Sequence, residues 1–85
     1  MPNVKLFANL RKLAGAKEIT ITGSTIGGVL MELIRRNPPL GNVILEDDGL
    51  RPHIIIALNG HNVTDLNIPV NEQDIVAIFP PIAGG

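Results

Sequence analysis

The sequence predicts an α+β protein in which a mixed four-stranded sheet carries one main helix on one face. Three observations lead to this prediction: segments near both ends alternate between polar and apolar residues, a central segment carries a helical apolar stripe, and a later segment is rich in β-branched residues. The chain has 85 residues, 45% of them hydrophobic and 18% charged. This length and composition suit a single domain with one core and argue against a disordered chain.

Two strands are expected near the start of the chain. Residues 3–9 alternate, with Val4 and Leu6 on one face and polar residues mostly on the other. A polar turn over residues 11–16 leads to a second alternating segment at 18–22. Two such segments joined by a short turn predict a hairpin.

The central segment predicts the main helix. Its apolar residues recur at the spacing of one helix face: Ile26, Val29, Leu30, Leu33 and Ile34. Ser24 or Thr25 is expected to cap its N-terminus. The helix should end at Asn37-Pro38-Pro39, because the residue before a proline leaves the α region and proline lacks an N–H.

The second half of the chain predicts two further strands. Residues 54–58 are apolar on both faces, which is typical of a strand buried on both sides or central in its sheet. Asn59-Gly60 predicts a tight turn because both residue types tolerate positive φ. Residues 63–70 should be irregular, with Pro69 excluding a central strand. Residues 74–79 form the last predicted strand, which ends at a pair of prolines.

The order of these elements predicts a β-grasp, or ubiquitin-like, roll. One helix with a single apolar stripe can cover only one face of the sheet. The right-handed crossover places the first and last strands side by side and parallel at the centre. We expect residues 1–79 to form this domain and residues 80–85 to form an extended, flexible C-terminal tail.

The charge and composition exclude several classes of protein. A formal net charge of −1 and a pI near 6.0 argue against nucleic-acid binding. The longest apolar run is much too short to span a membrane, and no export signal is expected at the start of the chain. The absence of cysteine removes disulfides and thiolate metal sites. A cytoplasmic location is therefore expected.

Side chains that suggest catalysis or metal binding are scattered along the chain. His53 and His61 are better interpreted as solvated than as metal ligands. The acidic run Glu46-Asp47-Asp48 does not match a calcium loop. Gly27-Gly28 precedes no P-loop pattern, so a phosphate site there is weakly indicated. We expect no metal site and no complete active site within the chain.

The end of the chain is the strongest functional candidate, with the sequence Phe79-Pro80-Pro81-Ile82-Ala83-Gly84-Gly85. The prolines cannot donate to a β-ladder and favour an extended backbone. The terminal glycines lack Cβ atoms, so the backbone and carboxylate fit a slot too narrow for other residues. The Gly85 carboxylate is the expected reactive group, with Gly84 beside it. A frayed terminus is the alternative interpretation.

Phe7 and Phe79 are the only aromatic residues of the chain. Alternation places Phe7 on the polar face of the first strand and Phe79 on the face of the last strand that points away from the helix. Because these strands are expected to be neighbours, the two rings should form one exposed apolar spot that anchors a partner. The alternative is that Phe7 folds under the loop at Leu13.

Three segments together resemble a known family. They are Val4-Lys5-Leu6-Phe7-Ala8 with Leu10-Arg11-Lys12-Leu13-Ala14-Gly15, then Asn59-Gly60, and above all residues 74–85 with the ending Phe-Pro-Pro-x-Ala-Gly-Gly. These residues resemble the MoaD family, the small sulfur-carrier subunits of molybdopterin synthase. The double proline distinguishes this ending from that of the related thiamine-pathway carrier ThiS, which shares only Gly-Gly.

The resemblance implies that the chain is no enzyme on its own but the sulfur-donating subunit of a complex. An E1-like adenylating enzyme of the MoaB/MoeB type would use ATP to adenylate Gly85, and a sulfur donor would then produce a thiocarboxylate. The tail, including Pro80, Pro81, Ile82 and Ala83, would enter a MoaE-like large subunit within a heterotetramer. There it would supply sulfur to a cyclic pyranopterin precursor of the molybdenum or tungsten cofactor. ATP would bind the activating partner, and this chain would bind no cofactor.

Three alternatives share the same residues. A ubiquitin-like modifier would use the same Gly-Gly ending to join lysines of other proteins. A ThiS-like carrier would supply sulfur to the thiamine pathway. A plain β-grasp interaction domain would need no carboxylate chemistry and would tolerate removal of Gly84 and Gly85.

Overall fold

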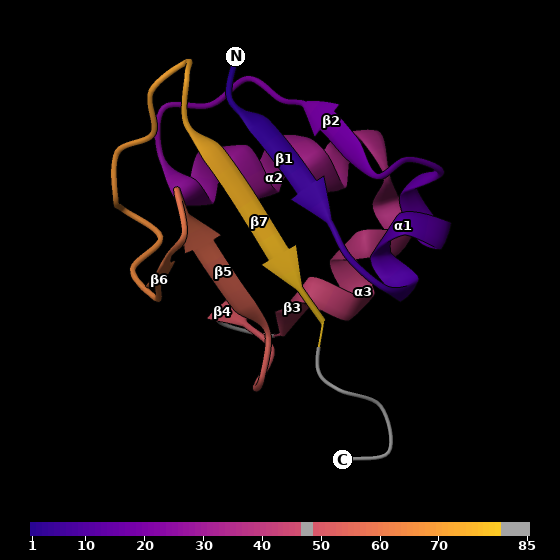
Figure 1. The fold of residues 1–85 in the computed structure, drawn as a ribbon. Helices are drawn as coiled ribbons and strands as arrows, with labels where there is room; N and C mark the ends of the chain where they lie inside the picture. Colours follow the sequence, from indigo (N-terminus) through magenta and orange to yellow (C-terminus); the bar gives the residue numbers. More distant parts are fainter. Residues whose placement is uncertain (47–48, 81–85) are drawn as a thin grey trace.

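The computed structural model describes residues 1–46 and 49–80 and has the expected α+β architecture (Figure 1). Its elements are β1 (Asn3–Leu6), α1 (Asn9–Ala14), β2 (Glu18–Thr20), α2 (Ile26–Arg36), the 3₁₀ helix η1 (Pro38–Leu40), α3 (Gly41–Ile44), β3 (Leu45–Glu46), β4 (Gly49–Leu50), β5 (Ile55–Leu58), β6 (His61–Val63) and β7 (Ile75–Phe79).

The main sheet has the strand order β2-β1-β7-β5-β6, and α2 lies across one of its faces (Figure 1). β1 and β7 are parallel neighbours, paired from Asn3 opposite Ile75 to Leu6 opposite Ile78. β1 pairs with β2, and β7 with β5, in the antiparallel sense. The β-grasp roll and the parallel pairing of the first and last strands are therefore confirmed.

The number of strands differs from the prediction. The main sheet has five strands because β6 pairs with β5, and β3 and β4 form a separate two-stranded ribbon. Segments of two or three residues carry too little alternation to be recognised in a sequence. The β5–β6 hairpin turns at Asn59-Gly60, whose φ angles of 51° and 87° confirm the predicted tight turn.

The expected polar turn over residues 11–16 is wrong, because a short helix, α1, begins at Asn9. β1 ends earlier than predicted, at Leu6. Fewer than two helical turns give a weak periodic signal. Burial of Leu10, which is 0% exposed, stabilises this helix, and Gly15 closes it in the left-handed conformation at φ 73°.

The main helix follows the prediction. The Thr25 hydroxyl caps it by accepting a hydrogen bond from the Gly28 N–H at 3.0 Å. The helix ends at Arg36, and the Asn37 N–H donates to the Leu33 carbonyl at 2.9 Å. Within the described ranges, no helix is long and apolar enough to cross a membrane.

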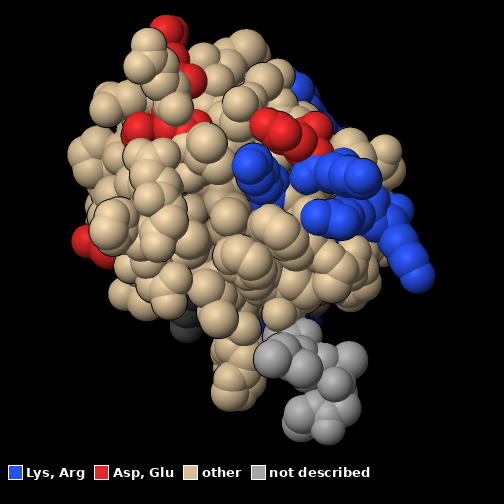
Figure 2. Space-filling model, viewed as in Figure 1, with Lys and Arg blue, Asp and Glu red and all other residues tan. Residues whose placement is uncertain are grey.

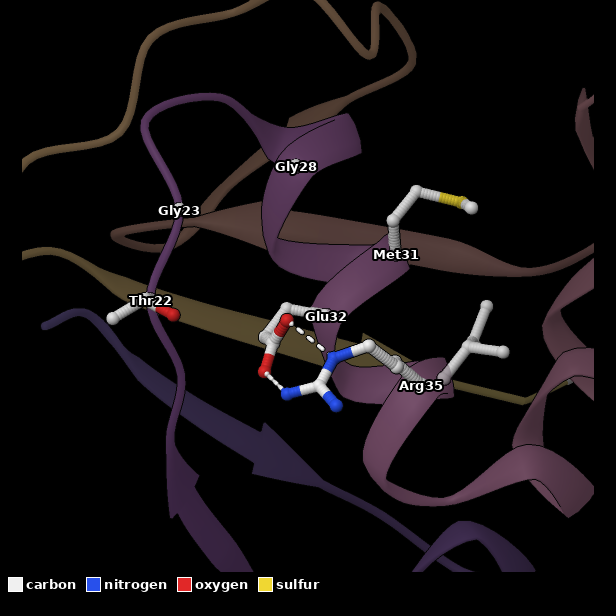
Figure 3. A pocket seen from close by; sticks show the side chains of 7 residues that line it. Thr22, Gly23, Gly28, Met31, Glu32 and Arg35 are labelled. Atoms are coloured by element: carbon white, nitrogen blue, oxygen red, sulfur yellow. Dashed lines mark hydrogen bonds and ion pairs between the residues drawn. The ribbon is translucent and has the colours of Figure 1, made fainter.

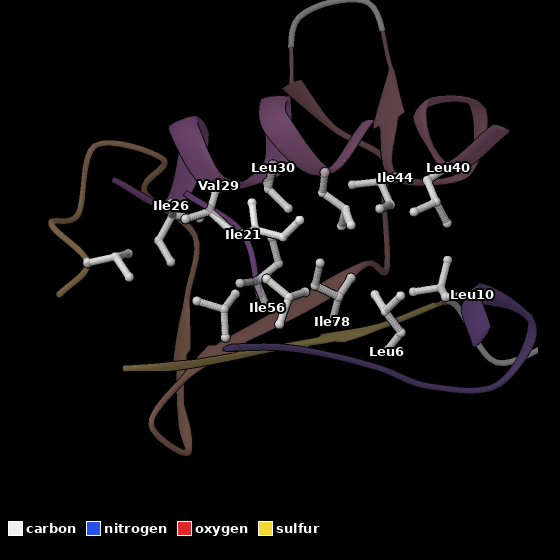
Figure 4. Packing of buried hydrophobic residues seen from close by; sticks show 14 residues of the cluster. Leu6, Leu10, Ile21, Ile26, Val29, Leu30, Leu40, Ile44, Ile56 and Ile78 are labelled. Atoms are coloured by element: carbon white, nitrogen blue, oxygen red, sulfur yellow. The ribbon is translucent and has the colours of Figure 1, made fainter. Parts of the chain in front are cut away.

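The hydrophobic core lies between α2 and the inner face of the sheet (Figure 4). β1 contributes Val4 and Leu6, and β7 contributes Val76 and Ile78, all 0% exposed. The strand at residues 54–58 was expected to be buried on both sides or central in its sheet. β5 is an interior strand between β7 and β6, but it is not buried on both sides, because Ile55 is 44% exposed. No described layer covers the outer face of the sheet, so its apolar residues meet solvent.

Candidate partner-binding site at the end of β7

The predicted contact between the two aromatic rings is present. The Phe7 and Phe79 rings stack with their centroids 4.4 Å apart and their planes 14° apart. The parallel register explains this contact, because Leu6 lies opposite Ile78 and the next residue of each strand follows on the outer face. Both rings are half-buried rather than exposed, since each covers the other. Their role in binding stays a prediction.

An unusual turn follows Phe7. Ala8 has φ 52° and ψ −131°, the conformation of the first central residue of a type II′ turn, which favours glycine. The Leu10 N–H donates to the Phe7 carbonyl at 3.1 Å across this turn. The strained turn redirects the chain directly after the aromatic ring.

Arg11 ties the turn back to β1. Its Nε donates to the Leu6 carbonyl at 2.7 Å, and its guanidinium carbon lies 5.2 Å from the centre of the Phe7 ring. This distance allows a cation–π contact. Arg11 was not singled out from the sequence, because Phe7 precedes α1 and a four-residue spacing brings side chains together only within a helix.

Further apolar residues extend the site along the outer face. Ile55 lies opposite Phe79 across the β5–β7 pair, and Ile75 is 38% exposed at the other end of β7. We call the outer-face patch the set Phe7, Ile55, Ile75, Ala77 and Phe79. Figure 2 shows this face as uncharged over β5 and β7, with Lys and Arg gathered toward β1, β2 and α1. An apolar centre beside charged residues is typical of protein interfaces.

Side chains at the start of β7 fix this strand in place. The Asn59 amide accepts from the Ile75 N–H and donates to Asp74, both at 2.9 Å. The Asn71 N–H donates to the other Asp74 carboxylate oxygen at 2.7 Å. The hydrogen bonds from Asn71 and Asn59 lower the pKa of Asp74. This network anchors the strand that carries Phe79.

The remaining predicted site residues fall on the tail. Pro80 is half-buried and is the last residue described. Pro81, Ile82, Ala83, Gly84 and Gly85 lie outside the described residues, as do Asp47 and Asp48. The chemical role of Gly85 and the extended form of the tail therefore stay predictions.

The glycines at the start of α2 are used within the fold. The Gly27 N–H donates to the Leu66 carbonyl at 2.8 Å, and the Gly28 N–H is held by Thr25. A Cβ added at Gly27 would meet the Leu66 oxygen at 3.2 Å. These two N–H groups are therefore unavailable to a phosphate, and the glycines serve close packing.

A hollow lies between α2 and the segment at Thr22 and Gly23, beside an ion-pair network on the helix surface (Figure 3). Glu32 accepts from Arg35 at 2.6 and 3.0 Å and from Arg36 at 3.1 Å. The hydrogen bond from Arg35, followed by that from Arg36, lowers the pKa of Glu32 to about 2. These exposed pairs stabilise the helix surface only weakly and leave the carboxylate occupied.

The two histidines are exposed, His53 before β5 and His61 at the start of β6. Across residues 1–46 and 49–80, no three His, Asp or Glu side chains gather closely enough to hold a metal ion. The outer-face patch, with the chain that follows it, is therefore the best candidate site that the fold offers.

Comparison with known proteins gives consistent matches. The model of the ThiS family matches residues 4–85. The small archaeal modifier protein 3 of Haloferax volcanii is 32% identical, with 96% of each chain covered. The molybdopterin synthase sulfur carrier subunit of Arabidopsis thaliana is 39% identical, covering 96% of this chain and 80% of that protein. The solution structure of the small archaeal modifier protein 1 from Methanosarcina acetivorans superposes with a TM-score of 0.86, at 33% identity over 98% of this chain and 94% of that one.

Proposed function

The chain belongs to the ThiS family of ubiquitin-like sulfur carriers and modifiers, and from this premise we propose that it carries sulfur on the carboxylate of Gly85. A carboxylate is a poor acyl donor because its leaving group would be oxide. An E1-like adenylating enzyme therefore uses ATP to form a Gly85 acyl-adenylate and releases pyrophosphate. A sulfur donor then displaces AMP and leaves a thiocarboxylate.

The observation that carries this proposal is the stacked pair of Phe7 and Phe79 at the end of β7. β7 is held between β1 and β5, so the position where the chain leaves the sheet is fixed beside an apolar surface. A partner that binds this surface receives the tail from a fixed starting point at Phe79. A fixed starting point raises the effective concentration of Gly85 near the partner's site.

We further propose molybdenum or tungsten cofactor biosynthesis as the pathway. The identity with the Arabidopsis sulfur carrier subunit supports this choice. In this role the charged tail enters a MoaE-like large subunit, and the thiocarboxylate sulfur attacks a cyclic pyranopterin precursor. Hydrolysis returns the Gly85 carboxylate for another cycle.

Alkylation followed by intact mass measurement tests the sulfur chemistry. The chain contains no cysteine, so a thiol-alkylating reagent has no side-chain thiol to modify. We expect one adduct, located on Gly85, in protein isolated from its own cells, and none in a variant lacking Gly84 and Gly85. Absence of an adduct even after supply of the activating enzyme and a sulfur donor would refute the proposal.

A second function is favoured by the two similar Haloferax volcanii proteins that are named modifiers. A modifier would undergo the same adenylation, after which a lysine amine displaces AMP and forms an isopeptide bond. Gly-Gly remnants on lysines of other proteins would demonstrate this function. Both functions can be assayed in the same cell extract.

A further inference from the structure

The seven Lys and Arg residues of the chain divide into two groups. Three lie within 4.0 Å of a carboxylate: Arg35 and Arg36, which share Glu32, and Arg51, beside Glu46. The other four have no carboxylate of the described residues within that distance, and all belong to the first 17 residues: Lys5, Arg11, Lys12 and Lys17. We call these four the basic corner.

The fold places the basic corner beside the outer-face patch. Lys5 lies on the outer face of β1, in register with Ala77 of the patch. Lys5, Arg11 and Lys17 line one shallow hollow together with Leu6, Phe7 and a carboxylate, that of Glu18, which lies opposite Lys5 across the β1–β2 pair. Because the four cations outnumber this one acid, the corner keeps a net positive charge. Figure 2 shows the cations of this face gathered toward β1, β2 and α1, with an acidic group beside them and an uncharged area over the middle of β7.

Arg11 is already positioned for an outside acceptor. Its Nε–H is bound to the Leu6 carbonyl, which fixes the plane of the guanidinium beside Phe7. Its other N–H groups donate no hydrogen bond to any residue in the described part of the chain. A guanidinium that is fixed in this way loses little entropy when it binds a carboxylate in a bidentate manner.

We propose that the basic corner binds a cluster of acidic side chains on the enzyme whose apolar pocket covers Phe7 and Phe79. This inference rests on the proposed function and specifies the chemistry of its partner. The cations flank an apolar aromatic centre, and charges at the rim of such a centre set orientation and association rate. A nucleic acid would instead need a continuous basic stripe and a net positive charge, whereas this chain has a net charge of −1.

The charges also make the docking asymmetric. The basic corner borders the patch on the side of β1, whereas on the other side the edge strand β6 brings the uncharged Asn62 into register with Ala57 of β5. A partner with acidic side chains beside its pocket can therefore dock in only one orientation. This orientation determines the direction in which the chain after Phe79 enters the partner.

A pair of matched charge reversals tests this inference. Lys17→Glu changes the basic corner, and Arg35→Glu makes the same change in charge on α2, remote from the sheet's outer face. ATP–pyrophosphate exchange by the E1-like adenylating enzyme of the same organism gives KM and kcat for the full chain and each variant. Direct binding to that enzyme is measured by calorimetry in parallel, and circular dichroism checks folding.

We expect Lys17→Glu to raise KM and Kd by about tenfold at about 50 mM salt with kcat unchanged, and the difference to shrink at about 500 mM salt. Arg35→Glu should leave KM and Kd near those of the unmodified chain. If the unmodified chain supports exchange, then equal changes in KM and Kd for both variants, or no change for either, would overturn the inference.

Other outcomes separate the inference from the proposed function. If the unmodified chain binds the enzyme without supporting exchange, the proposed function fails and the comparison of Kd values still decides the inference. If the unmodified chain does not bind at all, both fail. Sedimentation of the chain alone tests whether a second copy of the chain occupies the surface. Self-association that Lys17→Glu abolishes would show that it does and would overturn the inference.

Discussion

The inner and outer faces of the main sheet are built from alternating residues of the same strands, yet they differ in what covers them. On β7, Val76 and Ile78 are fully buried under α2, while Ile75 and Phe79 face outward. The inner face obtains its partners within the chain. The outer face has no covering layer among the described residues, and Ile55 and Ile75 on it are 44% and 38% exposed, so its apolar area is available to another protein. One short strand thus serves stability through one face and recognition through the other.

The strongest test of this difference compares two isoleucines of β7. Ile78→Ala removes a side chain that is 0% exposed. We expect a loss of about 2–5 kcal/mol in the free energy of unfolding, measured by urea denaturation. Ile75→Ala is the matched control, because Ile75 is 38% exposed. Its loss should be about 1 kcal/mol or less; similar losses for both variants would contradict the division into two faces.

The outer face is tested by Phe7→Ala. We expect unchanged circular dichroism and a rise of about tenfold or more in Kd for the adenylating enzyme or large subunit, since truncated aromatic anchors often cost about 1.4 kcal/mol or more. Leu13→Ala is the control, because Leu13 is 39% exposed on α1, outside the patch. Unchanged affinity of Phe7→Ala would show that the ring has a structural role alone.

The turn after Phe7 offers a test of local strain. Ala8→Gly should raise the free energy of unfolding by about 0.5–1 kcal/mol, because glycine relieves strain that exceeds its own entropic cost. Gly15→Ala is the reverse experiment at φ 73°, where an added Cβ meets nothing within 4 Å. It should lower the free energy of unfolding by about 1 kcal/mol. A loss of stability in Ala8→Gly would show that the turn is unstrained.

The network that fixes β7 predicts a dependence of stability on pH. The folded-state pKa of Asp74 lies below its ordinary value of 3.8, because the carboxylate accepts hydrogen bonds from Asn71 and Asn59. Its contribution is therefore complete above pH 3.8 and is lost as pH falls through the lower folded-state pKa. Asp74→Asn should weaken this decline in urea midpoints measured from neutral to acidic pH. An identical pH profile would exclude Asp74 as its source.

The smallest effect is expected on the helix surface. Glu32→Gln should change the urea midpoint at neutral pH only slightly, because the ion pairs with Arg35 and Arg36 are exposed. The pKa of Glu32 is lowered to about 2, so its contribution begins to be lost below pH 4.5 and is gone below about pH 2. Adenylation should be unaffected. Impaired adenylation of this variant would indicate that the adenylating enzyme docks on α2 instead of the sheet's outer face.

The longer elements of the fold could be predicted because each carries a complete pattern. The apolar stripe and Thr25 cap defined α2, and alternation together with crossover handedness placed β1 beside β7. The short elements could not be predicted. α1 has fewer than two turns and depends on burial of Leu10, while β6 depends on its pairing with β5.

The candidate site could be predicted to a similar extent. Alternation and strand order were enough to bring Phe7 next to Phe79. The exposure of Ile55 could not be predicted, because a continuous apolar run fits both a strand buried on both sides and a central strand with one uncovered face. The Ala8 turn and the contact of Arg11 with the Leu6 carbonyl depend on a backbone conformation for which alanine gives no signal.

The pairing of β1 with β7 also sets when the sheet can close during synthesis. β1 leaves the ribosome before β7, yet Asn3 must meet Ile75. Such distant pairing folds late, and until β7 arrives both β1 and β5 keep an unpaired edge. The strand that closes the sheet also carries Phe79 and leads into the Gly-Gly ending. An activating enzyme that requires the stacked pair would thereby act only on chains whose sheet has closed, and the topology would link activation to folding.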